Sequence, residues 1–313
     1  MTVTATEPIP MVLAEVQVAS VQRLSPSFVR LELAAPELAE VGLPDGSDGP
    51  WWDQRFKLVV PHAGGGLGSV TDADASWLGT WLERPVEERG HMRTYTVREL
   101  RGSGEQRRLV VDIVLHEGVS GPGSDWALAA EVGTRAVVLL PKRGLPFGGI
   151  EFLPRPEQRL LLVGDETAVP AICAILEHLP ADAKGAAFLE VPYSADVQEV
   201  SAPAGVEVTW LARGAQEHGA ALTAAVTAHL GGAVVALEIP EEVDPELWET
   251  PQWSSSGEEI NDDGSVRGDL YAWIAGEAGV VTGLRRHLVK ERGMDRRQVA
   301  FMGYWRRGVS MKS

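Results

Sequence analysis

The chain has a single cysteine, Cys173, and this scarcity excludes two classes of structure. An internal disulfide needs two cysteines, and a cysteine-ligated iron–sulfur cluster needs several. Cys173 falls in a stretch with helical character, where a buried and unreactive thiol is the favoured interpretation. The chain is therefore expected to fold without a covalent cross-link.

Long apolar runs are also missing, and basic residues are few. No run of 18 apolar residues occurs, and the first ten residues lack the basic start and apolar core of a signal peptide. With 28 basic against 44 acidic residues the formal net charge is −16, which repels nucleic acid and anionic membranes. We expect a cytoplasmic protein with no nucleic-acid partner and no stable membrane association.

Histidine is sparse as well, at seven residues. No pair of them has zinc-ligand spacing with a third partner nearby, so the sequence predicts no metal site made by the protein itself.

The first half of the chain has the pattern of an antiparallel barrel. Short segments, several of them alternating apolar and polar residues, are separated by clusters of Gly, Pro, Asp and Ser. With little helix between them, they predict a six-stranded antiparallel β-barrel within residues 10–153. The expected strands are 12–21, 28–33, 56–60, 92–99, 108–115 and 135–140.

In the second half, strands and helices alternate. This pattern predicts a Rossmann-like parallel α/β domain over residues 154–313, with helices on both faces of the sheet. The stretch 141–156, rich in Pro and Gly, is expected to join the two domains. The expected strands are 159–163, 186–191, 206–211, 233–238, 270–276 and 299–304, and the expected helices are 168–179, 220–230 and 279–291.

The most informative segment runs from Leu160 to Ile172. An apolar strand ends in Gly164-Asp165-Glu166-Thr167, and a helix follows. The unpaired N–H groups and the positive dipole end of such a helix suit a pyrophosphate or a nicotinamide amide. An ordinary strand–turn–helix with Asp165 or Thr167 as the cap explains the same pattern.

A second segment is Arg93-Thr94-Tyr95-Thr96. On a strand, Arg93 and Tyr95 share one face while Thr94 and Thr96 share the other. A ring beside a guanidinium and hydroxyl groups suits a planar cofactor that carries phosphate. A barrel strand with a solvated polar face is the alternative.

Two further segments each have two interpretations. Gly121-Pro122-Gly123-Ser124-Asp125-Trp126 follows a strong strand and His116, and its glycines and helix start either hold a phosphate or form a capped turn. Near the chain end, Gly303-Tyr304-Trp305-Arg306-Arg307-Gly308 either anchors the terminus or lines a site for an anionic substrate.

These four segments occur in the order seen in the siderophore-interacting protein family, which the chain resembles over about residues 12–308. That family comprises flavin-containing ferric-siderophore reductases of the ferredoxin–NADP reductase superfamily. The Gly-Asp-Glu-Thr-Ala turn distinguishes it from relatives with a Gly-Gly-Thr-Gly turn there. The resemblance implies an enzyme with FAD as cofactor and NADH or NADPH as electron donor. It would reduce Fe(III)-siderophore to Fe(II) and so release iron in the cytoplasm.

The resemblance also implies an FAD site on the barrel. Arg93 would neutralise the FAD phosphates, Tyr95 would pack on the isoalloxazine ring, and Thr96 would reach its N5 edge. The remainder of the dinucleotide would be held by His116, Gly121, Ser124 and Trp126. Because the cofactor carries the chemistry, no side chain is assigned as catalytic.

For the electron donor, the resemblance implies that Asp165, Glu166 and Thr167 receive the nicotinamide nucleotide. Glu277, at a strand end, either orients the nicotinamide or is simply solvated. Near the adenosine ribose the sequence offers the carboxylates of Glu190 and Asp196, which would repel a 2′-phosphate. NADH is therefore expected to be used at least as well as NADPH, although Arg213 on the next turn could reach the same edge.

For the substrate, an anionic ferric siderophore needs a local basic pocket on so acidic a chain. The family pattern implies Lys57, Lys142 or Arg143, Trp305 and Arg306 as contributors. Solvated cations are the alternative. Rival functions are another flavin reductase, an electron-transfer protein with ferredoxin as partner, and a non-enzymatic siderophore-binding protein. Two stretches, 42–54 and the acidic 249–269, look long for the family and are expected to flank the substrate cleft.

Overall fold

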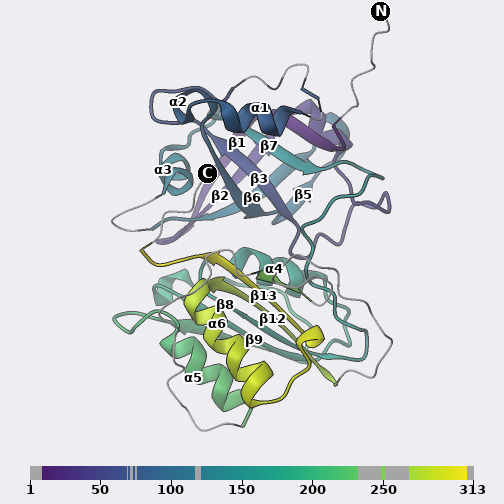
Figure 1. Cartoon of the computed structure of the whole chain (residues 1–313), viewed down its shortest axis with the longest axis vertical. Helices are drawn as coiled ribbons and strands as arrows, with labels where there is room; N and C mark the ends of the chain where they lie inside the picture. The colour runs from purple at the N-terminus through teal and green to yellow at the C-terminus, as the bar shows by residue number, and fades with distance from the viewer. Residues whose placement is uncertain are drawn as a thin grey trace, which may run out of the picture. The chain divides into compact units, whose positions relative to one another are not determined.

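A computed structural model of the chain describes residues 9–68, 70, 73–74, 76–116, 121–231, 248–250 and 268–308. The chain divides into two compact units between Ile150 and Glu151, within the stretch expected to join the domains (Figure 1). The expected strand 233–238 and most of the acidic stretch 249–269 lie outside the described residues. Within the described part of the chain, no helix combines the length and apolar character needed to cross a bilayer.

The first unit is a curled antiparallel sheet of seven strands, in the order β4-β3-β7-β1-β2-β6-β5 (Figure 1). The antiparallel architecture agrees with the sequence-based prediction, whereas the strand count exceeds the expected six. The strands are β1 (Met11–Ser25), β2 (Phe28–Ala34), β3 (Arg55–Val60), β4 (His91–Thr96), β5 (Glu99–Arg101), β6 (Arg108–Val114) and β7 (Arg135–Pro141).

The additional strand arises because the expected strand 92–99 is divided. β4 pairs with β3 and ends at Thr96, whereas β5 pairs with β6 and begins at Glu99. In the link, Val97 N–H donates to Gln54 O (2.8 Å) and Arg98 N–H donates to Val110 O (3.0 Å). The chain therefore passes from one edge of the sheet to the other within two residues, which brings the two edges together.

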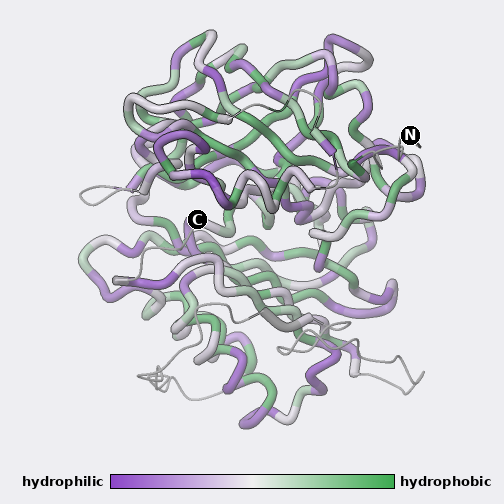
Figure 2. The backbone as a smooth tube through the Cα atoms, turned by 45° about the horizontal axis from the view of Figure 1, so that its top comes forward, coloured by the Kyte–Doolittle hydropathy of each residue, from purple (hydrophilic) through white to green (hydrophobic). Residues whose placement is uncertain are grey.

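The core of this unit is built from alternate strand residues. Leu31, Phe56, Leu58, Leu109 and Ile113 are each at most 1% exposed. Burying a side chain of this size contributes about 1.5–3 kcal/mol, so the alternation in the sequence specifies which face turns inward. Figure 2 shows the apolar residues concentrated along the strands.

Helices cover parts of this sheet. The short helices α1 (Trp77–Glu83) and α2 (Val86–Arg89) lie between β3 and β4 in the sequence and were not expected. Trp81 holds α1 in place: its ring packs with Val59, Val137 and Leu139, and its Nε1 donates to Arg89 O (3.0 Å). α3 (Pro122–Ala129) follows β6, and two 3-10 turns occupy Pro36–Glu40 and Gly104–Gln106.

The second unit is a six-stranded sheet in the order β10-β9-β8-β12-β13-β11, parallel except for the antiparallel edge strand β11. This agrees with the predicted parallel α/β domain. Its strands are β8 (Arg159–Gly164), β9 (Gly185–Val191), β10 (Val206–Ala212), β11 (Trp248–Glu249), β12 (Leu270–Glu277) and β13 (Val299–Trp305). Its helices are α4 (Val169–His178), α5 (Ala220–His229) and α6 (Ala278–Arg286), with a π-helical turn at His287–Glu291 and 3-10 turns at Ser194–Asp196 and Arg296–Gln298.

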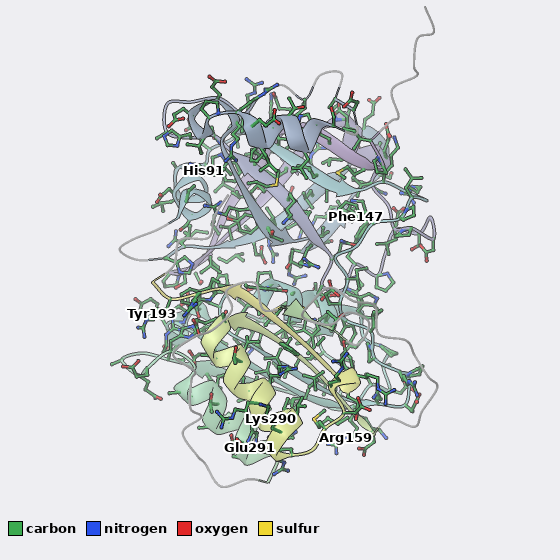
Figure 3. The ribbon with its side chains drawn as sticks, viewed as in Figure 1. His91, Phe147, Arg159, Tyr193, Lys290 and Glu291 are labelled. Atoms are coloured by element: carbon green, nitrogen blue, oxygen red, sulfur yellow. The ribbon has the colours of Figure 1, made fainter. Side chains whose placement is uncertain are left out.

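Helices cover both faces of this sheet, and its parallel strands all end at the same edge. Apolar residues of α5 and α6 pack with the same strand face, and α4 lies on the opposite face (Figure 1). Tyr193, which follows β9, and Arg159, which begins β8, lie at opposite ends of the sheet (Figure 3). The carboxyl end, marked by Tyr193, is the edge at which open parallel sheets bind ligands.

Candidate functional site

In the first unit, Arg93 and Tyr95 lie beside the N-terminus of α3. The contact is made by Gly123, where an ideal Cβ would lie 2.1 Å from Tyr95 Oη and 3.7 Å from Arg93 Cγ. A side chain at position 123 would therefore collide with the tyrosine. Glycine lets the first turn of α3 rest directly on Tyr95, next to the guanidinium-bearing side chain.

The charge of Arg93 has no acidic partner in the part of the chain that the structure describes. Its Nη1 donates to the neighbouring carbonyl of Met92 (2.8 Å), and burial lowers its pKa. The first N–H groups of α3 have no partner within the helix, as at every helix start. A guanidinium without a carboxylate beside a helix N-terminus fits a phosphate group, and hence the pyrophosphate of FAD.

Tyr95 is a neutral, well-packed aromatic at this position. Burial raises the pKa of its hydroxyl to about 12, and its ring centroid lies 6.4 Å from that of Phe56 on the paired strand. Thr96 is buried and lies on the other face of β4, where it pairs with Arg55 in register. The strand thus presents the tyrosine and the threonine in opposite directions, as the alternation predicted.

The other residues expected at the FAD site differ in where they lie: some are near the start of α3, and one packs in the core. Ser124 Oγ accepts a hydrogen bond from His116 N–H (3.2 Å), which ties the chain after β6 to the first turn of α3. Gly121 borders open space. Trp126 is only 8% exposed and packs in the barrel core, and its buried Nε1 has no hydrogen-bond partner among the described residues. It is thus mainly a core residue, because the apolar face of α3 turns it inward.

In the second unit, Asp165 joins three parts of the carboxyl edge. Its Oδ1 accepts from the N–H (2.9 Å) and the hydroxyl (2.5 Å) of Thr167, which closes the turn after β8. Its Oδ2 accepts from Glu277 N–H (2.8 Å) at the end of β12 and from Trp305 Nε1 (2.9 Å) at the end of β13. The carboxylate is thus an internal connector, and Asp165 is only 1% exposed.

Glu166 and Glu190 share one arginine. Arg213 binds Glu166 through two parallel hydrogen bonds of 2.9 and 3.0 Å, and its Nη1 also donates to Glu190 Oε1 (3.0 Å). Burial opposes the ionisation of Glu166, but His218 and Arg213 outweigh it and lower its pKa to about 2. Glu190 is fully buried and also accepts from Gly219 N–H (2.9 Å) and Leu222 N–H (3.3 Å), which fixes the start of α5.

His218 belongs to this cluster, and the sequence-based interpretation missed it. Its Nε2 lies 3.4 Å from Asp165 Oδ2 and 3.6 Å from Glu166 Oε2. Burial opposes protonation, but the two carboxylates outweigh it and raise the pKa of His218 to about 10. The available signal was its position, five residues after Arg213 in the loop between β10 and α5.

The same three residues also bear on metal binding. Donor atoms of Asp165, Glu166 and His218 all lie within 4.8 Å of one another. However, the two oxygens of Asp165 already accept four hydrogen bonds, and both oxygens of Glu166 bind Arg213. The carboxylates are therefore engaged by donors and cations of the protein itself, and we assign no metal site there.

Two expectations about the nucleotide edge need correction. Glu190 and Asp196 are both 0% exposed, and Asp196 Oδ2 accepts from Tyr193 N–H (3.0 Å). Neither carboxylate is at the surface to repel a 2′-phosphate, because each was drawn inward by main-chain donors. Arg213 is likewise engaged with two carboxylates, so its position gives no support for a role in choosing between NADH and NADPH.

Glu277 also differs from a solvated strand end. It is 8% exposed and caps α6, since its Oε2 accepts from Val280 N–H (3.0 Å). Its Oε1 accepts from Arg307 N–H (3.2 Å). Together with Asp165, it fastens the chain around Trp305 to the carboxyl edge of the sheet.

Of the expected substrate residues, Lys57 is an exposed cation on β3. Its Nζ donates to Thr94 Oγ1 (2.7 Å), and although the residue as a whole is exposed, partial burial of the amine and then the charge of Arg55 lower its pKa. Among the described residues no carboxylate pairs with Lys57. Trp305 is bonded to Asp165, and Arg306 follows it as a half-buried residue.

Arg143 is engaged within the long stretch 42–54. It donates to Gly46 O (2.7 Å) and Val41 O (3.0 Å), and it pairs with Asp48. Hydrogen bonds from Arg107 and Arg143 lower the pKa of Asp48 to about 2. Arg143, which was expected to bind substrate, therefore stabilises the 42–54 loop, because carbonyl and carboxylate oxygens in and beside that loop surround its guanidinium. The neighbouring alternative, Lys142, pairs with Glu40 (2.6 Å).

Comparison with known proteins identifies the family. Residues 17–145 match the siderophore-interacting FAD-binding domain, and residues 157–308 match the siderophore-interacting protein model. The chain belongs to the siderophore-interacting protein family. This confirms the resemblance stated from the sequence motifs and establishes the first unit as an FAD-binding domain.

Several relatives share most of the chain. Ferric vibriobactin reductase ViuB of Vibrio cholerae is 29% identical over 286 residues, which cover 91% of this chain and 86% of that protein. The siderophore utilization protein from T. fusca is 30% identical with a TM-score of 0.65, covering 99% of this chain and 98% of the other. The siderophore-interacting protein SipS from Aeromonas hydrophila is 28% identical with a TM-score of 0.64, covering 96% and 94%.

The fold extends beyond this family. The ferredoxin reductase of carbazole 1,9a-dioxygenase is 15% identical with a TM-score of 0.52, and it covers 95% of this chain and 70% of the other. At this identity the likeness concerns the fold alone. It agrees with the observed combination of a curled antiparallel sheet and a parallel α/β sheet.

Proposed function

We propose that the chain is a flavoenzyme that uses NADH or NADPH to reduce a ferric siderophore and so release Fe(II) in the cytoplasm. The observation that supports it most strongly is the Arg93–Tyr95–Gly123 arrangement within a domain of the siderophore-interacting FAD-binding type. Similarity to ferric vibriobactin reductase supports the choice of substrate class.

Bound FAD would accept an electron pair from the nicotinamide nucleotide and pass electrons singly to Fe(III). The chain's own residues bind and orient. Arg93 and the first turn of α3 would hold the pyrophosphate, and Tyr95 would offer a neutral aromatic surface to the ring system. Because oxygen chelators hold the less highly charged Fe(II) more weakly, reduction loosens the iron from its chelator.

On a chain of net charge −16, an anionic ferric siderophore needs positive charge close to its binding surface. Lys57, which has no carboxylate partner in the described part of the chain, and Arg306 are the side chains we assign to this role. Trp305, which ends β13 and precedes Arg306, would add an apolar ring beside that arginine.

The test separates the two half-reactions. The purified protein should be yellow and contain FAD, and stopped-flow mixing with NADH or NADPH should bleach the flavin band. Lys57→Ala and Arg306→Ala should weaken reduction of anionic ferric siderophores without slowing flavin reduction, whereas Arg135→Ala, which removes an exposed cation paired with Glu15, should change neither.

Three outcomes would contradict the proposal in different ways. A colourless protein that takes up no FAD would indicate a siderophore-binding protein without enzymatic activity. Flavin reduction without saturable siderophore turnover would indicate a general flavin reductase. Reduction of the bound flavin by a ferredoxin, but by neither NADH nor NADPH, would mean that ferredoxin is the electron donor.

A further inference from the structure

The carboxyl edge of the parallel sheet holds a cluster of buried charge. Asp165, Glu166, Glu190 and Glu277 are each at most 8% exposed. Arg213 compensates two of them, Glu166 and Glu190. Among the described residues His218 also faces this cluster: its side chain is 9% exposed, and its Nε2 lies 3.4 Å from Asp165 and 3.6 Å from Glu166.

His218 also contacts the segment assigned to the substrate. Its ring meets the indole of Trp305 edge to face, with centroids 5.2 Å apart and planes at 87°. The same indole donates its N–H to Asp165, the carboxylate that His218 faces. Trp305 is therefore held on two sides, by a hydrogen bond to Asp165 and by the imidazole ring packed against it.

We propose that His218 is a positioning residue for the ferric-siderophore site, which as an imidazolium holds Trp305 and the following Arg306 against the turn after β8. This rests on the proposed function, in which Trp305 and Arg306 contact the siderophore. His218 itself would touch neither iron nor cofactor. It would act by holding Asp165 and Trp305 in one arrangement.

The surroundings favour the charged ring. The ring faces Asp165 and Glu166, which lie in the turn after β8. Arg213, in the same loop as His218, binds Glu166. Glu277, at the end of β12, and Trp305, at the end of β13, both bind Asp165 through their N–H groups. Farther out, Glu217 pairs with Arg307 at 3.4 Å. Asp165 and Glu166 both lie close to His218, whereas the single Arg213 is shared between Glu166 and Glu190. A protonated His218 therefore offsets negative charge at this edge, consistent with its pKa of about 10.

The decisive comparison is His218→Gln, which removes the charge at similar size. It should raise the KM for an anionic ferric siderophore about tenfold, equivalent to about 1.4 kcal/mol, with a smaller change in kcat. Flavin reduction by NADH in stopped flow should stay unchanged. His218→Lys should restore part of the KM, and the matched control His229→Gln should leave it unaltered, because His229 is exposed and packs on Phe188.

A second measurement does not depend on activity. In ¹⁵N-histidine NMR of the wild-type protein, the His218 signal, assigned by its loss in His218→Gln, should keep the shift of a protonated ring at pH 8. A neutral ring at that pH overturns the inference, even where the variants are too unstable for kinetics. If Trp305→Ala and Arg306→Ala raise the KM but His218→Gln does not, the inference also fails while the proposed function stands. If none of the three raises it, the substrate assignment itself is wrong.

Discussion

Gly123 and Tyr95 are in direct contact, so closely that an ideal Cβ on Gly123 would lie 2.1 Å from Tyr95 Oη. This places a helix N-terminus against the aromatic residue of the Arg93–Thr96 segment. Neither the glycine nor the tyrosine alone identifies a cofactor site. Their contact supports the proposed FAD site, because it places the start of α3 beside the strand that carries Arg93.

Gly123→Ala is expected to lower FAD occupancy sharply, since the added methyl group must displace Tyr95 or α3. The overpacking should also cost about 1–3 kcal/mol of unfolding free energy. FAD content per protein, read from the visible spectrum, and urea denaturation measure the two effects. The matched control is Gly79→Ala in α1, where a Cβ would also enter open space. Equal FAD loss in both variants would show that the Tyr95 contact is not the cause.

Arg93→Ala is expected to weaken FAD binding by about 1.5–3 kcal/mol, the contribution of a hydrogen bond to a charged group. Titration of the apoprotein with FAD, followed by flavin fluorescence, gives the dissociation constant. Arg101→Ala is the control, because Arg101 is already paired with Glu99 and Glu32. Unchanged affinity in Arg93→Ala would remove this residue from the phosphate site.

Arg213→Ala is expected to destabilise the second unit by about 3–5 kcal/mol, since it leaves the buried carboxylates of Glu166 and Glu190 without their partner. The ratio of NADH to NADPH reactivity should stay constant. Urea denaturation and stopped-flow flavin reduction test the two parts, with the exposed Arg159→Ala as control. A lost NADPH preference with unaltered stability would restore Arg213 to the nucleotide site.

The stability contributed by His218 should depend on pH in a defined direction. Its pKa in the folded protein is about 10, against an ordinary value of 6.5. The contribution is therefore fully present below pH 6.5, declines as the pH rises towards 10, and is lost above that. The difference in unfolding free energy between wild type and His218→Gln, measured at pH 6, 8 and 10, should shrink in that order. A difference that is constant across this range would mean that the ring is neutral in the folded protein.

Much of the fold was predictable because alternation and apolar runs directly record which residues face a core. β2, β8 and α4, for example, end within a few residues of the expected positions. The division between β4 and β5 was not predictable, since alternation continues through Val97 and Arg98. Only the change of hydrogen-bonding partner, from Gln54 to Val110, marks the break, and that depends on how the sheet closes.

The candidate site was predictable from the sequence where a short motif contains its residues. It was not predictable where the packing of separate loops brings its residues together. Alternation placed Arg93 and Tyr95 on one face of a strand, and the family resemblance implied their role at the FAD site. The burial of Glu190 and the approach of His218 to Asp165 could not, because they depend on loops from separate strands meeting at one edge. An acidic residue at a strand end looks the same in the sequence whether it faces solvent or caps a helix inside the protein.

The passage of the chain from β4 to β5 has a consequence for self-association. Open sheets expose two rows of unpaired main-chain groups, which can recruit strands from other molecules and lead to aggregation. Here both edge strands are short, at six and three residues, and the link between them is bonded to the rest of the unit through Val97 N–H to Gln54 O and Arg98 N–H to Val110 O. The strand with Arg93 and Tyr95 can therefore lie at an edge of the sheet while offering little length for pairing with a second molecule.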